Sequence, residues 1–224
     1  MPILFRKKYE VKYNWLMIGT KVLEERKSKF NGELKVVRSL GFGTYIQSNG
    51  LTQSGGIVET IWKQTLKKIR RKRQNIKDIL ILGLGGGTVA KLVKKYWPEA
   101  KITGVDIDPV MVEFGKKYLG LDKMDVEIKI SDAYNFMSKS SKQKYFDLII
   151  VDLYNGDKFP EKFEKENYME FVKTVLKSGG IAIFNRLYYG DRRPEAVRFG
   201  GKLQKIFSHV DWYYPEANLM FLCR

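Results

Sequence analysis

A glycine-rich turn between two apolar segments could hold a nucleotide-type ligand. Residues 79–82 are aliphatic and suit a strand buried on both faces, and residues 89–97 suit a helix. The glycines between them are Gly83, Gly85, Gly86 and Gly87. A strand, a side-chain-free turn and a helix in this order place backbone N–H groups and the positive end of a helix beside a ligand. Taken alone, such a turn is also compatible with a tight strand-to-helix connection.

A carboxylate about 20 residues beyond the turn points to a nucleoside. Residues 102–106 read as a second strand that ends in Asp106, the position at which a βαβ nucleotide site binds ribose hydroxyls. Thr88 stands where a dinucleotide-binding turn would often carry another glycine. The sequence therefore favours a nucleoside without a pyrophosphate, such as S-adenosylmethionine, over NAD.

Polar residues also follow the later predicted strands, and a parallel sheet would bring them to one crevice. Together with Asp106 they are Asp108, Asp132, Asp152 and Asn155. Ligands of such sheets bind beyond the carboxyl ends of the strands, so these residues are candidates for binding and for acid–base chemistry. Aspartate before a helix is also a preferred N-cap residue, and this alternative applies above all to Asp132.

The elements that must position these residues alternate between strand and helix from Asp78 onward. Strands are predicted at residues 79–82, 102–106, 126–130, 146–151, 180–184, 210–213 and 218–222. Helices are predicted at residues 89–96, 109–118, 133–138, 165–176 and 194–207. This alternation predicts an α/β, Rossmann-like domain with helices on both faces of a mostly parallel sheet.

The first 54 residues follow a different pattern. Asn31-Gly32 and Asn49-Gly50 are hairpin-turn signals, and residues 20–27, 33–38 and 44–47 read as strands. We therefore predict a small antiparallel β unit over residues 1–54 and a nucleoside-binding domain over residues 55–224. The second domain would begin with a linking segment at residues 55–77, helical from residue 57 to about residue 73.

Composition argues against several classes of protein. Of the 224 residues, 44% are hydrophobic, which is enough for a core, but the apolar patch at residues 15–18 is too short to cross a bilayer. The chain has one cysteine, Cys223, and one histidine, His209, and so has almost no ligands for a zinc site. We expect no metal, no membrane association and a cytoplasmic location.

A formal net charge of +16 raises the question of nucleic-acid binding. Residues 67–73 form the densest basic run and could bind the phosphates of RNA or DNA. The other lysines are dispersed along the predicted helices, which is more typical of a solvated surface. Nucleic acid is therefore an open but less favoured partner.

Residues 79–184 resemble the spermidine synthase (polyamine aminopropyltransferase) family and its relatives with the class I S-adenosylmethionine-dependent methyltransferase fold. The resemblance lies in the glycine turn, Val105-Asp106-Ile107-Asp108, Ser131-Asp132-Ala133, residues 146–152 and Lys177-Ser178-Gly179-Gly180. It implies a seven-stranded sheet with an antiparallel last strand, a small N-terminal β domain and a homodimer.

The resemblance also assigns cofactor contacts by position. The glycine turn would wrap the methionine-like tail of S-adenosylmethionine, or of its decarboxylated form. Asp106, with Ile107 beside it, would take the ribose hydroxyls. Asp132, with Ala133, would meet the adenine amino group.

The acceptor side is assigned in the same way. Asp152 falls where the family has the carboxylate that helps to deprotonate the attacking amine, a role that suits a carboxylate close to a protonated amine. Tyr154 and Asn155 would line the acceptor side with it. Gln53, Glu59 and Asp157 are the further candidate contacts to a small-molecule acceptor.

Three departures from the family pattern bear on the reaction. Gly86 replaces an aspartate that binds the amino end of a decarboxylated donor in the family, and Asn155 replaces a second acid that binds the polycation. Asp157, in the following loop, is the acid that could partly compensate. The segment at residues 53–59 is several residues shorter than in the family. These departures favour a methyltransferase, with a polyamine aminopropyltransferase as the alternative and a non-catalytic nucleoside- or RNA-binding protein as the third hypothesis.

Overall fold

The computed structural model describes residues 19–140 and 145–224. The apolar patch at residues 15–18 lies outside these ranges. In the part of the chain that is described, no helix is both long and apolar enough to span a membrane.

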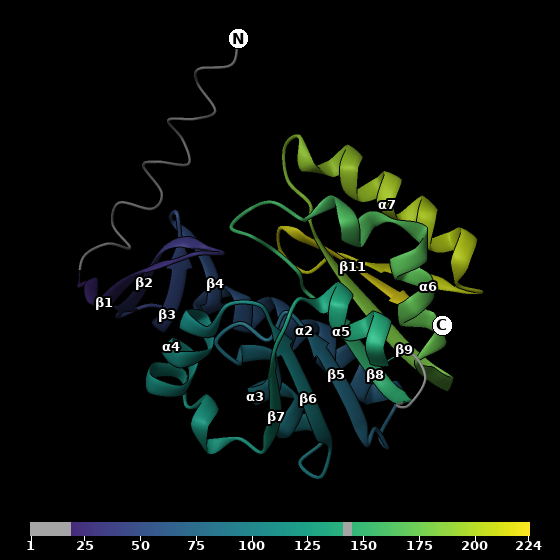
Figure 1. Ribbon diagram of the computed structural model, residues 1–224, viewed down its shortest axis with the longest axis horizontal. Helices are drawn as coiled ribbons and strands as arrows, with labels where there is room; N and C mark the ends of the chain where they lie inside the picture. Colours follow the sequence, from purple (N-terminus) through teal and green to yellow (C-terminus); the bar gives the residue numbers. More distant parts are fainter. Residues whose placement is uncertain (1–18, 141–144) are drawn as a thin grey trace.

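The described part of the chain begins with a four-stranded antiparallel sheet, which confirms the predicted β unit. Its strands, in both chain and spatial order, are β1 (Lys21–Ser28), β2 (Gly32–Ser39), β3 (Gly43–Ser48) and β4 (Leu51–Gly55). The turns at Asn31-Gly32 and Asn49-Gly50 connect β1 to β2 and β3 to β4. Figure 1 shows this sheet in purple and dark blue, at the upper left of the larger sheet.

β4 was not predicted, because its residues lack the apolar–polar alternation of a half-buried strand. Two kinds of contact hold it. It pairs with β3, where Ile46 lies opposite Ser54. It also meets the glycine turn, since the N–H of Gly86 donates to Ser54 Oγ and the N–H of Gly55 donates to Thr88 Oγ1, both over 2.7 Å. The N-terminal sheet is thereby joined to the turn on which the predicted site depends.

The second sheet has seven strands. They are β5 (Asp78–Leu82), β6 (Lys101–Asp106), β7 (Val126–Ile130), β8 (Phe146–Val151), β9 (Leu176–Leu187), β10 (Val210–Tyr213) and β11 (Asn218–Cys223). Their spatial order is β10-β11-β9-β8-β5-β6-β7, in which β11 runs antiparallel to both neighbours and the other neighbouring pairs are parallel. The predicted mixed sheet with an antiparallel end is confirmed.

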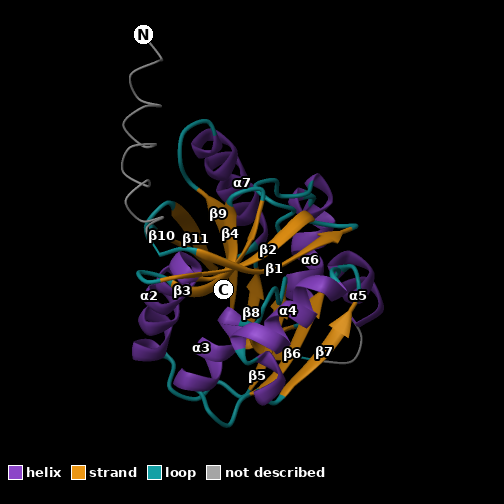
Figure 2. Cartoon of the chain, turned by 90° about the vertical axis from the view of Figure 1, so that its left-hand side faces the viewer, coloured by secondary structure: helices purple, strands orange, loops and turns teal. Residues whose placement is uncertain are grey.

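Helices cover both faces of this sheet. They are α2 (Gly56–Lys72), α3 (Thr88–Tyr96), α4 (Pro109–Leu119), α5 (Ala133–Ser140), α6 (Glu166–Thr174) and α7 (Arg192–Ile206). Alternate residues of β5 serve the two faces: Ile79 and Ile81 pack with α2 and α3, and Leu80 and Leu82 with α5, α6 and α7. Figure 2 shows α2 and α3 to the left of the sheet and α5 and α6 to its right. α4 contacts both sheets: Met111 and Phe114 pack against the N-terminal sheet, and Val112 belongs to the core shared with α2 and α3.

β9 differs from its predicted extent. It begins at Leu176, within the region predicted as the end of a helix, and α6 ends at Thr174. The register against β8 shifts between Phe146 and Leu148, which accommodates the extra residues around Gly179, whose φ is 72°. Because of this irregularity, the sequence periodicity does not predict the first residues of β9.

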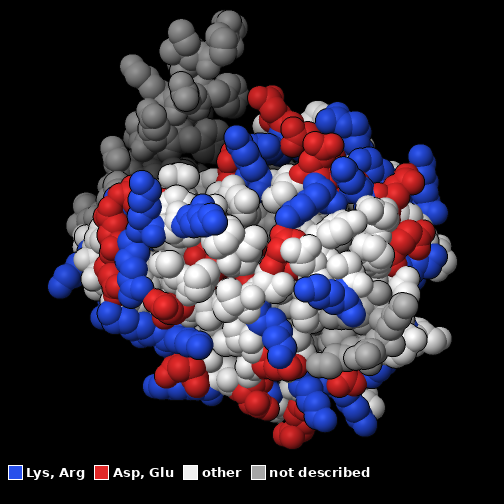
Figure 3. Space-filling view, viewed as in Figure 1, with Lys and Arg blue, Asp and Glu red and all other residues white. Residues whose placement is uncertain are grey.

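The basic run at residues 67–73 lies in and just beyond the last turns of α2 and is partly used in packing. Arg70 Nε donates to the carbonyl oxygen of Tyr96 over 3.0 Å, and the ammonium of Lys68 lies 4.9 Å from the ring centroid of Tyr213. On the face drawn in Figure 3, Lys and Arg are spread over the surface and intermixed with Asp and Glu. Nucleic-acid binding stays a prediction.

Candidate functional site

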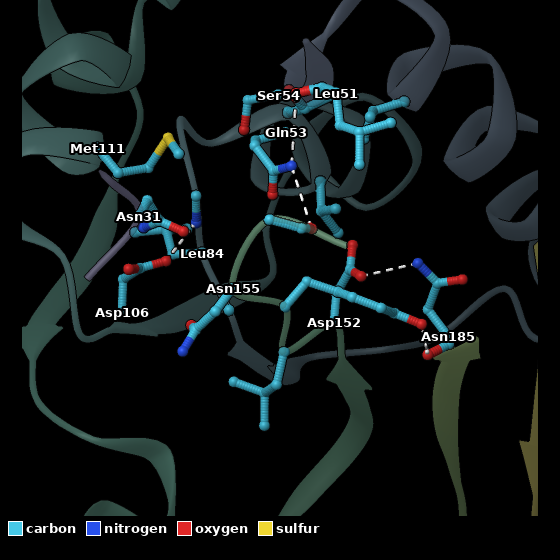
Figure 4. A pocket seen from close by; sticks show the side chains of 18 of the residues that line it. Asn31, Leu51, Gln53, Ser54, Leu84, Asp106, Met111, Asp152, Asn155 and Asn185 are labelled. Carbon is cyan, nitrogen blue, oxygen red and sulfur yellow. Dashed lines mark hydrogen bonds between the residues drawn. The ribbon is translucent and has the colours of Figure 1, made fainter. Parts of the chain in front are cut away.

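A cavity of about 490 Å³ opens beyond the carboxyl ends of β5, β6, β8 and β9, between the central sheet and β4. Figure 4 shows Asp106 on one side of it, Asp152 and Asn185 on the other, and Gln53 and Ser54 from β4 above them. The topology thus brings together the ends of parallel strands, as the sequence predicted, and adds a wall from the N-terminal sheet.

The glycine turn forms one wall of the cavity through Gly83 and Gly85. The N–H groups of Gly83 and Leu84 both donate to the carbonyl oxygen of Val105, which holds the turn against β6. Gly83 has a φ of 90°, and a side chain there would overlap the carbonyl oxygen of Asp152. Only glycine fits this close approach of β5 to the residue after β8. Gly86 and Gly87 are not part of the cavity wall.

Asp106 points at the glycine turn. The N–H of Gly85 donates to its Oδ2 over 2.7 Å, and the N–H of Asp108 donates to its Oδ1 over 2.9 Å. Burial raises the pKa of Asp106 to about 6, and the backbone hydrogen bonds oppose that shift. Ile107 lines the cavity beside it. Asp106 therefore offers a nucleoside an acceptor that is fixed by the same turn that would contact the nucleoside.

Two of the other strand-end acids cap helices. Asp108 is fully buried, and its Oδ1 accepts the N–H groups of Val110 and Met111 at the start of α4. The Oδ1 of Asp132 accepts the N–H groups of Tyr134 and Asn135, over 3.0 and 3.1 Å. The N-cap alternative for Asp132 is therefore real. It does not exclude a binding role, because Asp132 also lines the cavity, with Ala133 next to it.

The second oxygen of Asp132 forms an ion pair with Lys162. Lys162 belongs to the short 3-10 helix η3 (Glu161–Glu164), which follows the loop after β8, and it also lines the cavity. A ligand that uses Asp132 must share this carboxylate with Lys162 or displace it.

Asp152 is held by donors from two directions. Its Oδ2 accepts the indole N–H of Trp62 over 2.9 Å, and its Oδ1 accepts the Nδ2 group of Asn185 over 2.7 Å. The Oδ1 of Asn185 in turn accepts from Asn218 over 2.8 Å. Burial raises the pKa of Asp152, while the bonds from Asn185 and Trp62 lower it. The result is an oriented carboxylate in the cavity, with a raised affinity for a proton.

Tyr154 and Asn155 lie beside Asp152 in the cavity wall but differ in role. The hydroxyl of Tyr154 accepts the N–H of Leu187 over 2.8 Å, and burial raises its pKa well above the ordinary value. Asn155 is exposed, and its backbone pairs with Lys158 across a tight turn. Neither residue supplies the second negative charge that the family pattern places in this region.

The three candidate acceptor contacts are not brought together. Gln53 lines the cavity, and its Nε2 donates to the carbonyl oxygen of Gly156 over 3.3 Å. Glu59 is half-buried on α2 and pairs with Lys91 at 3.3 Å, outside the cavity wall. Asp157 pairs with Arg192 at 2.6 Å, also outside it.

Several residues of the cavity escaped the sequence analysis, namely Ser54, Trp62, Lys162, Asn185 and Glu216. Asn185 carried a signal, because it directly follows the predicted strand at residues 180–184, as Asp152 follows the predicted strand at residues 146–151. The other four carried none. They come from β4, the apolar side of α2, η3 and the turn between β10 and β11, and only packing brings them to the strand ends.

Comparisons with known proteins show the family. Residues 60–210, more than half of the chain, match the spermine/spermidine synthase domain. Spermine synthase SPE4 of Saccharomyces cerevisiae is 28% identical over 211 residues, which cover 86% of this chain and 68% of the yeast protein. The eEF1A lysine and N-terminal methyltransferase homolog of Drosophila melanogaster is 28% identical over 158 residues, covering 66% of this chain and 23% of that protein.

The fold is shared with a solved structure. Spermidine synthase from Thermotoga maritima superposes with a TM-score of 0.74 at 20% identity, covering 90% of this chain and 72% of that one. The relatives therefore divide between proteins named for aminopropyl transfer and proteins named for methyl transfer.

Proposed function

The chain belongs to the spermine/spermidine synthase family, and we propose that it is an S-adenosylmethionine-dependent methyltransferase that acts on a small-molecule acceptor. The observation that carries the proposal is the arrangement of Asp106 against the glycine turn, at the edge of a cavity that also contains an oriented carboxylate, Asp152. A nucleoside bound across the strand ends would contact Asp106 and the glycine turn, and an acceptor would contact Asp152.

The cavity fits the donor on grounds of shape and chemistry. A side chain on Gly85 would come within 2.7 Å of Ser54 Oγ, so glycine at this position lets β4 pack against the turn that lines the cavity. Asp106 would accept the ribose hydroxyls, and Asp132 would accept from the adenine amino group through the oxygen that it shares with Lys162. S-adenosylmethionine supplies a methyl group already activated by the sulfonium, so the protein's contribution is mainly alignment.

Asp152 is the candidate proton acceptor for the incoming nucleophile. Trp62 and Asn185 fix the direction of its carboxylate, and burial raises its pKa, which makes it a stronger proton acceptor than an exposed aspartate. Tyr154 does not share this role, because its phenol keeps its proton.

Methyl transfer is favoured over aminopropyl transfer by the charges around the acceptor side. Asp157 is paired with Arg192, Glu59 with Lys91, and Asn155 is neutral. A polyamine carries several positive charges, and a chain with a net charge of +16 and so few free acids at this end would bind it weakly.

The second candidate function is aminopropyl transfer from decarboxylated S-adenosylmethionine. It is favoured by the likeness to Spermine synthase SPE4, which extends over 86% of this chain. Both candidate functions require a sulfonium nucleoside. They differ in whether the tail of that nucleoside keeps its carboxylate and in which acceptor is used.

Calorimetry with both donors, followed by product analysis with putrescine and a panel of small amines, tests the proposal. We expect tighter binding of S-adenosylmethionine and release of S-adenosylhomocysteine. The variant Asp106→Ala should bind neither donor measurably, which ties the signal to this cavity. Tighter binding of the decarboxylated donor together with consumption of putrescine would establish aminopropyl transfer instead.

A further inference from the structure

The far end of the glycine turn meets Ser54 and not the cavity. The N–H of Gly86 donates to Ser54 Oγ over 2.7 Å, and Ser54 lines the cavity while Gly86 does not. Thr88, the first residue of α3, lies on the same wall. A donor tail that follows the turn toward α3 would therefore meet two hydroxyls.

Position 86 cannot easily contribute a side chain here. A Cβ on Gly86 would lie 2.7 Å from Ile46 Cδ1 and 2.8 Å from Leu119 Cδ1, between β3 and α4. A side chain would thus enter an apolar contact between the N-terminal sheet and α4. The contribution of Gly86 is therefore its backbone N–H, which holds the hydroxyl of Ser54 in place.

Each of the two hydroxyls has a proton to give. Ser54 is 2% exposed and Thr88 5% exposed. Each accepts one backbone N–H, from Gly86 and Gly55 respectively, over 2.7 Å. A hydroxyl that accepts still has its own O–H to donate, and among the described residues no acceptor is recorded for either proton. Both donors are buried in the wall of the cavity, beside the N-terminal N–H groups of α3.

The acids of the cavity are engaged elsewhere. Asp106 accepts from Gly85, Asp132 pairs with Lys162, Asp152 accepts from Trp62 and Asn185, and Glu216 accepts from Gln64. None of them is hydrogen-bonded to Ser54 or Thr88. This end of the cavity therefore offers neutral donors and the positive end of a helix, which suit an anion better than an ammonium group.

We propose that the hydroxyls of Ser54 and Thr88 bind the carboxylate of the methionine tail and so select intact S-adenosylmethionine over its decarboxylated form. This inference rests on the proposed function, because it presupposes a sulfonium nucleoside in the cavity. On this proposal, a residue of the N-terminal sheet and the first residue of α3 together determine which form of the methionine-derived cosubstrate binds.

Calorimetry with three ligands separates the tail from the nucleoside. S-adenosylhomocysteine carries the carboxylate, decarboxylated S-adenosylhomocysteine lacks only that group, and methylthioadenosine lacks the whole amino-acid end. For the unaltered protein we expect the first to bind about tenfold or more tighter than the second, the size of a hydrogen bond to a charged group.

The variants Ser54→Ala and Thr88→Val should each lower the affinity for S-adenosylhomocysteine about tenfold and change that for methylthioadenosine less than twofold. Ser48→Ala is the matched control, because Ser48 is also a buried serine of the N-terminal sheet but its Oγ donates to the carbonyl oxygen of Asn31 and lies outside the cavity wall. It should leave the ratio of the two affinities unchanged.

The possible failures are distinguishable. If the unaltered protein binds S-adenosylhomocysteine and methylthioadenosine but neither variant changes the affinity for either ligand, the carboxylate site is wrong and the proposed function stands. If the variants weaken both ligands equally, Ser54 and Thr88 act only on the shape of the turn, which also overturns the inference. If the unaltered protein binds none of the three ligands, the proposed function and the inference fall together.

Discussion

The indole N–H of Trp62 donates to Asp152 Oδ2 over 2.9 Å, and so ties the helix that follows the N-terminal sheet to the end of the central strand β8. Trp62 is fully buried, and Asn185 completes the hold on the carboxylate from the other side. A carboxylate with two fixed donors has little freedom to rotate, and its remaining lone pairs face a defined direction. Trp62 is therefore a positioning residue for the candidate base.

Replacing this tryptophan tests that role. Trp62→Phe keeps an aromatic ring but removes a donor to the ionised carboxylate, so we expect a further rise in the pKa of Asp152. The acid limb of the pH–rate profile should move to higher pH, and kcat at pH 7 should fall about tenfold. Trp97→Phe is the control, because Trp97 is also buried and its Nε1 donates to the carbonyl oxygen of Arg73, away from the cavity. Equal losses in the two variants would reduce Trp62 to a packing residue.

The raised pKa of Asp106 predicts how nucleoside binding depends on pH. Ribose hydroxyls donate to the ionised carboxylate, and with a pKa of about 6 this form is lost as the pH falls through 6. Each pH unit below that value should therefore weaken nucleoside binding by up to about tenfold. Calorimetry with methylthioadenosine between pH 5 and 8 measures the effect.

Two controls make that prediction specific. Asp106→Asn cannot ionise, so its residual affinity should not vary with pH over this range. A 2′,3′-dideoxy analogue has no ribose hydroxyls to donate, so its binding should also be insensitive to pH. A dideoxy analogue that shows the same pH dependence as methylthioadenosine would mean that Asp106 does not bind the ribose.

The ion pair between Lys162 and Asp132 predicts competition with the adenine amino group. Lys162→Met removes the competitor, and because exposed ion pairs contribute up to about 1 kcal/mol, the affinity for methylthioadenosine should rise by up to about fivefold. Lys158→Met is the matched control, since Lys158 lies on the same connection but outside the cavity wall. Weaker binding by the Lys162 variant would show that the lysine supports the ligand and does not compete with it.

Two strands of the central sheet were predicted with the bounds that they have in the structure, for different reasons. Residues 146–151 are mostly apolar, as is typical of a buried parallel strand, and residues 126–130 alternate apolar and charged side chains along a half-exposed edge strand. β4 was not predictable, because Leu51-Thr52-Gln53-Ser54-Gly55 has the composition of a loop and becomes a strand only by pairing with β3 and docking on the glycine turn.

The cavity residues also divide into those that the sequence could indicate and those that it could not. Asp106, Asp132 and Asp152 could be found because each closes a recognisable strand, and a parallel sheet brings such ends together. Trp62 and Lys162 could not, because each acts on an acid from 90 and 30 residues away in the chain. Glu59 and Asp157 had the right charge for an acceptor contact, but each has a cationic partner outside the cavity, and charge alone does not reveal that partner.

Tyr154 provides a last test of which group takes the proton. Its hydroxyl accepts the N–H of Leu187, and its raised pKa keeps the phenol protonated at any working pH. Tyr154→Phe leaves that N–H without its acceptor, which should cost about 1–3 kcal/mol in the free energy of unfolding but leave the shape of the pH–rate profile unchanged. Tyr145→Phe, at a residue that is 60% exposed, should change the stability by less than about 0.5 kcal/mol. Asp152→Asn, in contrast, should abolish most of the rate. If Tyr154→Phe lost as much rate as Asp152→Asn while remaining fully stable, the phenol and not the carboxylate would be the group that accepts the proton.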